Sequence, residues 1–378
     1  MDFKQIKRVY FIGIGGIGMS AIARYFHFHG KLVSGYDKTE TSLTRKLVEE
    51  GIEVHYADDV ALVPKDADIV VYTPAIPSTH KGLSFLRQNN YTLLKRSEVL
   101  GIITEASFNI CIAGTHGKTT ISSMVAHLLR DSGYGCNAFL GGIAVNYNSN
   151  YWSNERNVCV IEADEYDRSF LRLHPDIALI SAMDADHLDI YGDEETMRDA
   201  FVEFAGKIKP GGTLYYKHGL ARETRLTSDA SYSYHFSDPA ADVHAENIRM
   251  EEGSYHFDVV TSRRRLDGFT LNMGGLHNIE NMVAAISIAD QLEIDPGKIR
   301  HAVHSYRGVK RRFEYIIKGS AEEGPVYVDD YAHHPEELRA LLSGARKLFP
   351  SLECIVIFQP HLFTRTRDFY QGFAEALD

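Results

Sequence analysis

An apolar stretch that leads directly into a glycine loop and then into a helix constrains this fold more than any other feature. The segment Phe108–Ala113 is apolar, the loop Gly114–Thr120 reads Gly-Thr-His-Gly-Lys-Thr-Thr, and helical residues continue from Ile121. A strand, a glycine loop and a helix in this order are the context that a phosphate-binding loop requires. The standard pattern would place a further glycine at Ile112, so only the shorter Gly-x-x-Gly-Lys-Thr form is present.

Residues of this loop and the acids around it predict a triphosphate site. Backbone N–H groups can hold phosphates, Lys118 can neutralise charge at the β/γ end, and the Thr119 hydroxyl can bind magnesium. Magnesium needs hard oxygen ligands, and four acids follow the next apolar strand: Glu162, Asp164, Glu165 and Asp167. Strand alternation predicts that Glu162 and Asp164 share one face. Further acids follow another strand, within Asp184–Asp189.

A second glycine loop lies near the N-terminus. Gly13, Gly15 and Gly18 follow an apolar strand and open a helix, and Asp37 ends the next strand. This is the dinucleotide fingerprint, which places a diphosphate against glycines and a helix N-terminus. Taken alone, the loop leaves a nicotinamide-dependent oxidoreductase as an alternative. A nucleotide-binding protein without catalytic activity is a second alternative.

Strands and helices alternate along most of the chain, which predicts α/β domains with parallel sheets. We expect boundaries near Ser107 and Lys318, giving units of residues 1–107, 108–318 and 319–378. Alternating polar and apolar residues in 228–274 predict a small antiparallel excursion. The third unit is expected to hold two parallel strands, one of them at Leu352–Pro360. Two strands are too few for a stable sheet, so this domain is expected to be incomplete here.

Composition excludes several classes of protein. The 378 residues are 44% hydrophobic and 24% charged, with a net charge of -11, so a general nucleic-acid binder is not expected. The four cysteines are too widely spaced for a zinc cluster and fit reduced thiols. Neither a signal peptide nor an apolar run of about 20 residues is apparent, so we expect a cytoplasmic protein without a membrane segment. Arg263–Arg265 is expected in a solvated hairpin, which leaves Lys310–Arg312 as the candidate basic cluster.

Six motifs follow one another along the chain. They are GTHGKTT, EADEYD, DADHLDIYG, GLHNIEN, GVKRRFE and DDYAHHP. In this order the chain resembles the Mur ligase family, over essentially every residue present. Within that family, GIGGIGMS near the start and FQPHLFTRTRD near the end are similar to the member that adds alanine. A related ligase that recycles peptides is the alternative.

The resemblance implies a fold and a reaction. The fold would comprise an N-terminal Rossmann-like domain for a uridine nucleotide sugar, a central P-loop ATPase α/β domain and a C-terminal Rossmann-like domain that is truncated here. The reaction would be ATP-dependent ligation of L-alanine to the carboxylate of UDP-N-acetylmuramate through an acyl phosphate, in peptidoglycan precursor synthesis. ATP and Mg²⁺ are the implied cofactors, and the implied partners are these small molecules.

The resemblance also assigns roles to central residues. ATP would be bound by Gly114, Thr115, His116, Gly117, Lys118, Thr119, Thr120, His277, Asn278, Asn281, Arg312 and Asp330. The implied metal ligands are Thr119, Glu162 and His187. The implied catalytic set is Lys118, Glu162, His187, Arg312 and His333. His333 or His334 is the candidate base for deprotonating the amine.

Substrate residues are implied at both ends of the chain. The uridine nucleotide sugar would contact Gly13, Gly15, Gly16, Gly18, Met19, Ser20, Asp37, Thr73, Pro74, Ala75 and Arg96. The amino-acid side would be formed by Tyr331, His334, His361 and Arg365. Several positions depart from the family pattern: Tyr166 and Arg168 replace smaller residues, Ala332 replaces a glycine, and Leu362 stands where a basic residue is common. The last departure leaves Arg365 as the candidate for carboxylate recognition.

Overall fold

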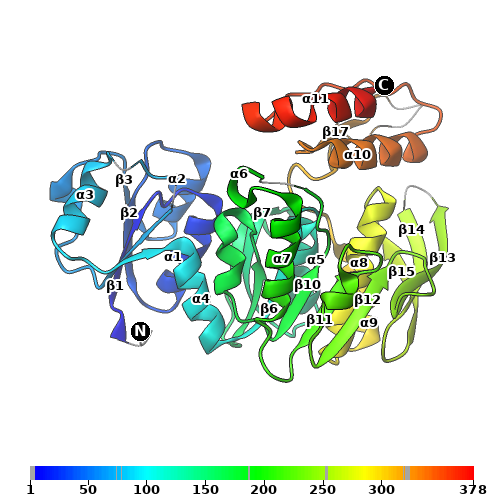
Figure 1. The fold of residues 1–378 in the computed structure, drawn as a ribbon, viewed down its shortest axis with the longest axis horizontal. Helices are drawn as coiled ribbons and strands as arrows, with labels where there is room; N and C mark the ends of the chain where they lie inside the picture. The colour runs from blue at the N-terminus through cyan, green and yellow to red at the C-terminus, as the bar shows by residue number, and fades with distance from the viewer. Residues whose placement is uncertain are drawn as a thin grey trace.

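The computed structural model describes residues 5–73, 75–77, 79–185, 188–251, 254–317, 319 and 324–378. Its elements form three units in chain order, coloured blue to cyan, green to yellow, and orange to red in Figure 1. Within these ranges, none of the helices combines the length and the apolar character needed to cross a bilayer.

The N-terminal unit is a five-stranded parallel sheet in the order β3-β2-β1-β4-β5. Strand residues such as Val9, Phe11 and Val71 are fully buried, as expected when helices cover both faces of a parallel sheet. The elements of this unit are β1 (Arg8–Ile12), α1 (Ile17–Phe28), β2 (Leu32–Tyr36), α2 (Ser42–Glu49), β3 (Glu53–His55), β4 (Ile69–Tyr72), α3 (Lys81–Gln88), β5 (Leu93–Lys95) and α4 (Arg96–Ala106).

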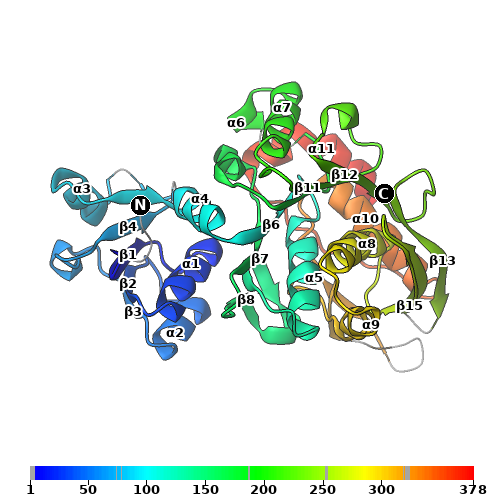
Figure 2. The ribbon, with the colours of Figure 1, turned by 90° about the horizontal axis from the view of Figure 1, so that it is seen from below.

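The central unit is a ten-stranded sheet in the order β15-β14-β13-β12-β11-β10-β6-β9-β7-β8. Figure 2 shows α5, α8 and α9 side by side against it. The elements are β6 (Phe108–Ala113), α5 (Lys118–Asp131), β7 (Asn137–Ala144), β8 (Ser149–Trp152), β9 (Val158–Glu162), β10 (Ile177–Ile180), α6 (Leu188–Tyr191), α7 (Glu194–Ala205), β11 (Thr213–Lys217), β12 (Ala230–His235), β13 (Val243–Glu251), β14 (Ser254–Val260), β15 (Arg265–Leu271), α8 (Leu276–Gln291) and α9 (Pro296–Ser305).

The segment 228–274 is only partly antiparallel. β12 pairs in parallel with both β11 and β13, and the antiparallel pairs are β13-β14 and β14-β15. These strands extend the central sheet and do not form a separate excursion. Arg263 and Arg264 lie in the turn between β14 and β15, with Arg265 opening β15, and each of the three pairs with an acidic side chain. The predicted hairpin is therefore confirmed.

The third unit contains β16 (Glu314–Ile317), β17 (Tyr327–Asp329), α10 (Pro335–Leu348) and α11 (Phe363–Leu377). β16 and β17 pair in an antiparallel manner. The prediction of a second parallel strand at Leu352–Pro360 is wrong, because this segment is in no strand. A strand forms only where a neighbouring strand can pair with it, and none lies beside this segment in the described part of the chain. Ile355 and Ile357 are accordingly 83% and 88% exposed.

A buried junction joins the N-terminal and central units. Helix α1 packs against β7 and β8, and one apolar cluster includes Phe26 of α1 and Phe139 of β7. Asn150 of β8 is fully buried; its amide donates to Ile17 O (2.7 Å), and its carbonyl oxygen accepts from Arg24 Nη1 (3.0 Å). The central unit thus holds the first turn of the helix that the N-terminal glycine loop opens.

Candidate active site

The phosphate loop connects β6 to α5 and is braced by the neighbouring strand β10. Gly114 and Gly117 adopt φ of +137° and +83°, where a side chain is strained. A Cβ at Gly114 would also collide with Ser181 Oγ. The Ser181 hydroxyl donates to carbonyls on both sides of Gly114, those of Ala113 (3.2 Å) and His116. Ser181 was not predicted as a site residue; its position just after β10 gave no local signal.

Lys118 is held at the centre of this loop by a buried carboxylate. Its Nζ donates to Gly114 O (2.7 Å) and to Glu165 Oε1 (2.8 Å), and the Glu165 side chain is only 1% exposed. Burial by itself would lower the pKa of Lys118, but Glu165 and Asp164 raise it above its ordinary value. The ammonium group is therefore charged at neutral pH. Glu165 in turn is fixed because Tyr191 OH donates to its backbone carbonyl (2.7 Å).

Thr119 and Glu162 place oxygen atoms side by side next to Lys118. Thr119 Oγ1 donates to Glu162 Oε1 (3.0 Å), and Gly141 N donates to Glu162 Oε2 (2.8 Å). Burial raises the pKa of Glu162, and Lys118 opposes that effect. A hydroxyl and a carboxylate suit magnesium, which takes one or two protein carboxylates and completes its shell with water and phosphate oxygens.

The other candidate metal ligands are His187 and the acids that follow Glu162. Across the described ranges, no group of three or more His, Cys, Asp or Glu side chains is arranged to hold a metal ion. His187 lies outside the described residues. β9 ends at Glu162, and Asp164 lies 3.4 Å from Arg96 Nη2, while its charge also raises the pKa of Glu162.

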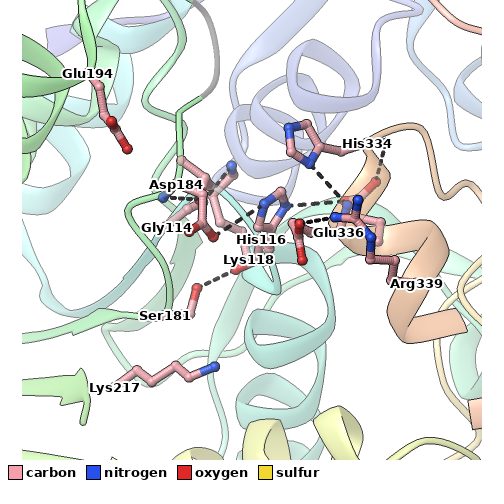
Figure 3. Close-up of polar contacts among 12 residues, drawn as sticks. Gly114, His116, Lys118, Ser181, Asp184, Glu194, Lys217, His334, Glu336 and Arg339 are labelled. Carbon is pink, nitrogen blue, oxygen red and sulfur yellow. Dashed lines mark hydrogen bonds and ion pairs between the residues drawn. The ribbon is translucent and has the colours of Figure 1, made fainter. Parts of the chain in front are cut away.

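Residues of the central and third units line a common cavity of about 420 Å³. Figure 3 shows His116 of the phosphate loop between Asp184, after β10, and His334 and Glu336 at the start of α10. Among the predicted residues, the cavity is lined by Thr115, His116, Gly117, Lys118, Thr119, Thr120, Glu162, His277, Asn278, Asn281, Arg312, Asp330 and His333. Residues from positions 115 to 333 thus share one space.

The start of α8 forms one wall of this cavity. Asn278 Nδ2 donates to Gly274 O (2.5 Å), and Asn281 Nδ2 donates to Asn278 Oδ1 (3.4 Å). Lys217 lies 2.9 Å from Glu280 on the same wall, and neither residue was predicted. They come from β11 and α8; Glu280 lies within the motif GLHNIEN, whereas no motif marks Lys217.

Asp330 forms hydrogen bonds both to the segment that connects the central and third units and to the loop before α10. Its two carboxylate oxygens accept from Phe313 N (2.6 Å) and Ala332 N (2.7 Å). Burial raises the pKa of Asp330, while these N–H groups and Arg312 oppose the change. These contacts connect the end of the central unit to the third unit.

Glu337 of α10 is surrounded by predicted site residues, although the sequence did not single it out. Its carboxylate accepts from His333 N (2.9 Å) and lies 3.6 Å from both His116 Nδ1 and Arg312 Nη1. Burial alone would raise the pKa of Glu337, but His116, His333 and Arg312 hold it well below its usual range. The available signal was a capping box: His334 is the N-cap, Pro335 begins the helix and Glu337 is its third residue.

The residues predicted for the amino-acid side lie close to His333. The rings of Tyr331 and His361 are 4.8 and 5.9 Å from the His333 ring. Tyr331, His333 and His361 also line a second cavity, of about 680 Å³, in the third unit. Arg365 on α11 is buried, with 7% of its surface exposed.

The N-terminal glycine loop lies at the carboxyl ends of β1 and β2. Gly13 has φ of +86°, and Gly15 N donates to Asp37 Oδ2 (2.7 Å), so Asp37 supports the loop. Gly16 is the N-cap of α1. Thr73 packs near Gly13, and Ala75 N donates to the Thr73 hydroxyl (3.5 Å).

Four other residues were predicted for the N-terminal site, and the structure describes the surroundings of Met19, Ser20 and Arg96. Met19 is buried in the apolar core, and the Ser20 hydroxyl donates to Ile17 O (2.9 Å). Pro74 lies outside the described residues. Arg96 lies so close to Gly18 that a Cβ there would be 2.9 Å from Arg96 Nη1. Since Arg96 also reaches Asp164, it links the N-terminal loop to the neighbour of Glu165.

Comparison with known proteins identifies the class. Residues 8–108 match the model described as Mur ligase family, catalytic domain; residues 112–289 match the Mur ligase middle domain; and residues 311–378 match the Mur ligase glutamate ligase domain. The chain belongs to the Mur ligase family, whose members are ATP-dependent amide-bond ligases.

The curated relatives of this chain are named for one particular activity within the family. UDP-N-acetylmuramate–L-alanine ligases of Flavobacterium johnsoniae and Cytophaga hutchinsonii are 46% and 48% identical to it, over 100% of this chain and 82% of each relative. A crystal structure of the UDP-N-acetylmuramate–alanine ligase of Thermotoga maritima is 28% identical, with a TM-score of 0.83 over 99% of this chain and 83% of that one. A murein peptide ligase from Psychrobacter arcticus, at 22% identity and a TM-score of 0.74, shares the fold.

Proposed function

We propose that this protein joins L-alanine to the carboxylate of UDP-N-acetylmuramate, converting ATP to ADP and phosphate in peptidoglycan precursor synthesis. The observation that carries the proposal is the cavity in which Lys118, Thr119 and Glu162 of the central unit meet Arg312 and His333. The curated relatives bear the name of this activity. We place the reaction in the cytoplasm and assign nucleotide-sugar binding, ATP binding and closure to the units expected at residues 1–107, 108–318 and 319–378. β16 (Glu314–Ile317) would serve the third unit through its pairing with β17.

Activation of the carboxylate is the first chemical step in this proposal. A carboxylate is a poor electrophile, so its oxygen attacks the γ-phosphorus of ATP, and ADP leaves from an acyl phosphate. Lys118 and Arg312 would stabilise the negative charge on the transferred group, because preorganised charges act most strongly in a site that excludes water. Thr119 and Glu162 would hold Mg²⁺, which neutralises phosphate charge when it is bound.

The N-terminal loop and the phosphate loop would be bridged by the sugar nucleotide. Gly13, Gly15 and Gly18 would receive the diphosphate, with Arg96 beside them. Support comes from two neighbouring acids: Asp164 contacts Arg96, and Glu165 contacts Lys118. The two anion-binding regions are therefore linked through consecutive residues, which suits a substrate that extends from one to the other.

Attack by the amine is the second step. The nitrogen of alanine adds to the acyl carbon, and phosphate leaves from the tetrahedral intermediate. His333 is our candidate for the base: its Nδ1 donates to Tyr331 O (2.6 Å), which leaves the lone pair on Nε2. Burial lowers the pKa of His333, so the ring is neutral near pH 7 and can accept the proton of the amine.

Phosphate release tests the proposal. Release from ATP would be measured with magnesium, with UDP-N-acetylmuramate and L-alanine each present or omitted, and release should require both. Release without the sugar nucleotide would refute the assignment of the N-terminal loop. A tripeptide that replaced alanine efficiently would instead favour a recycling ligase, and reduction of a nicotinamide cofactor would favour an oxidoreductase.

A further inference from the structure

Glu337 is a largely buried carboxylate that the proposed chemistry leaves without a role. Only 16% of its side chain is exposed, and the residues that it contacts come from different parts of the chain. His116 belongs to the phosphate loop, Arg312 to the link between units, and His333 to the loop that precedes α10. One carboxylate thus faces Arg312 and His333, which are placed at the two chemical steps, and His116 of the phosphate loop.

We infer that Glu337 is a positioning residue that couples the third unit to the phosphate loop and holds His333 in the orientation required for accepting a proton. This inference rests on the proposed ligase function. It adds a requirement that the function alone does not make. The same side chain must determine the position of the phosphate loop and the orientation of the candidate base.

The contacts of Glu337 divide between its two oxygens. Oε1 lies 3.6 Å from both His116 Nδ1 and Arg312 Nη1, on the side of the phosphate loop. Oε2 accepts from His333 N (2.9 Å) and lies 3.5 Å from His333 Nδ1, on the side of the candidate base. Because the carboxylate is planar and rigid, movement of either side changes the position of the other.

The surroundings of His116 reinforce this coupling. His116 Nε2 lies 3.5 Å from Asp184 Oδ2, and its ring is 5.1 Å from the ring of His334, the N-cap of α10 (Figure 3). The His334 ring packs in turn 5.0 Å from Phe369 of α11. His116 therefore contacts the third unit through α10, and Glu337 is the charged part of that contact.

The charges around His333 determine which experiment is informative. Glu337 favours its protonated form, as does the carbonyl of Tyr331, whereas burial and the cations Arg365 and Arg312 favour the neutral form. The rings of Tyr331 and His361 complete its surroundings. Glu337→Gln keeps the size of the side chain and removes its charge, so protonated His333 should become less stable.

The test compares Glu337→Gln with Glu375→Gln. Glu375 carries the same charge on the same unit, but it lies on α11, pairs with Arg339 (3.2 Å) and is 57% exposed. For Glu337→Gln we expect kcat to fall roughly 10²-fold, the scale of a misplacement of about 1 Å. The KM for UDP-N-acetylmuramate should not change. The acid limb of kcat/KM for alanine should move about 1 pH unit lower, because an opposite charge has been removed.

A folded Glu337→Gln variant with wild-type kcat and an unshifted acid limb would overturn the inference. His116→Asn supplies an independent measurement through a double-mutant cycle with Glu337→Gln. If the two residues act together, the double variant should lose little more than the worse single variant, and fully additive losses would also overturn the coupling. Wild-type protein that fails to release phosphate with both substrates would instead refute the function on which the inference rests.

Discussion

Replacing Lys118 with methionine removes the ammonium group from the centre of the phosphate loop while keeping most of the side-chain volume. In the proposed mechanism this charge stabilises the transferred phosphoryl group, and loss of one such preorganised group costs about 10²–10³-fold in kcat. The same change leaves Glu165, with 1% of its side chain exposed, without its cation. Removing one partner of a buried ion pair destabilises a protein by about 3–5 kcal/mol.

These two effects can be separated with a second substitution. Lys118→Met/Glu165→Gln removes both charges, so the unfolding free energy should recover most of the loss seen in Lys118→Met. Turnover should not recover, because the charge at the γ-phosphate is still absent. Phosphate release and urea unfolding would be measured on the wild type and both variants. Recovery of turnover in the double variant, or near-normal kcat in Lys118→Met, would refute the role assigned to Lys118.

Three other substitutions follow from the structure. Glu162→Gln should raise the magnesium concentration needed for half-maximal turnover, measured by titration with the metal, while Glu293→Gln at the surface should not. Gly114→Ala should cost at least about 1–3 kcal/mol of stability in urea unfolding, because its φ is +137° and Ser181 blocks the space for a Cβ. The neighbouring cations lower the pKa of Glu337 in the folded state, so its ionised form stabilises the fold. The difference in unfolding free energy between the wild type and Glu337→Gln should be complete above about pH 5 and should decrease as the pH falls through the folded-state pKa. A constant difference down to pH 3 would contradict this.

Residues with local signals were the easiest to predict. The strand, the glycine loop and the helix indicate the positions of Lys118 and Thr119, because the residues that form this arrangement lie within a few positions of one another in the sequence. The alternation of strands and helices likewise predicted the parallel sheet of the first unit and the parallel part of the central sheet. The family resemblance extended the prediction to residues such as His277 and Arg312, which now line the same cavity.

Assignments that depend on distant contacts were harder. Four acids lie within 162–167, and the sequence does not show which one meets Lys118. The answer depends on where β9 ends and on a turn in which Asp167 and Arg168 both have positive φ. Ser181 and Lys217 reach the cavity from separate strands, so nothing near them in sequence marks them. The apolar run 352–360 resembles a strand, but a strand forms only where another can pair with it.

The buried junction at Asn150 determines which parts of the protein can adjust to the ligands. Drawing α1 away from β8 would leave Ile17 O, the Arg24 guanidinium and both ends of the Asn150 amide without these partners, and each unsatisfied buried group costs about 1–3 kcal/mol. The spacing between the N-terminal glycine loop and the phosphate loop is therefore fixed when the chain folds. In the proposed mechanism, the first two units would set the length of substrate that fits between the loops, and the third unit would align the reacting groups.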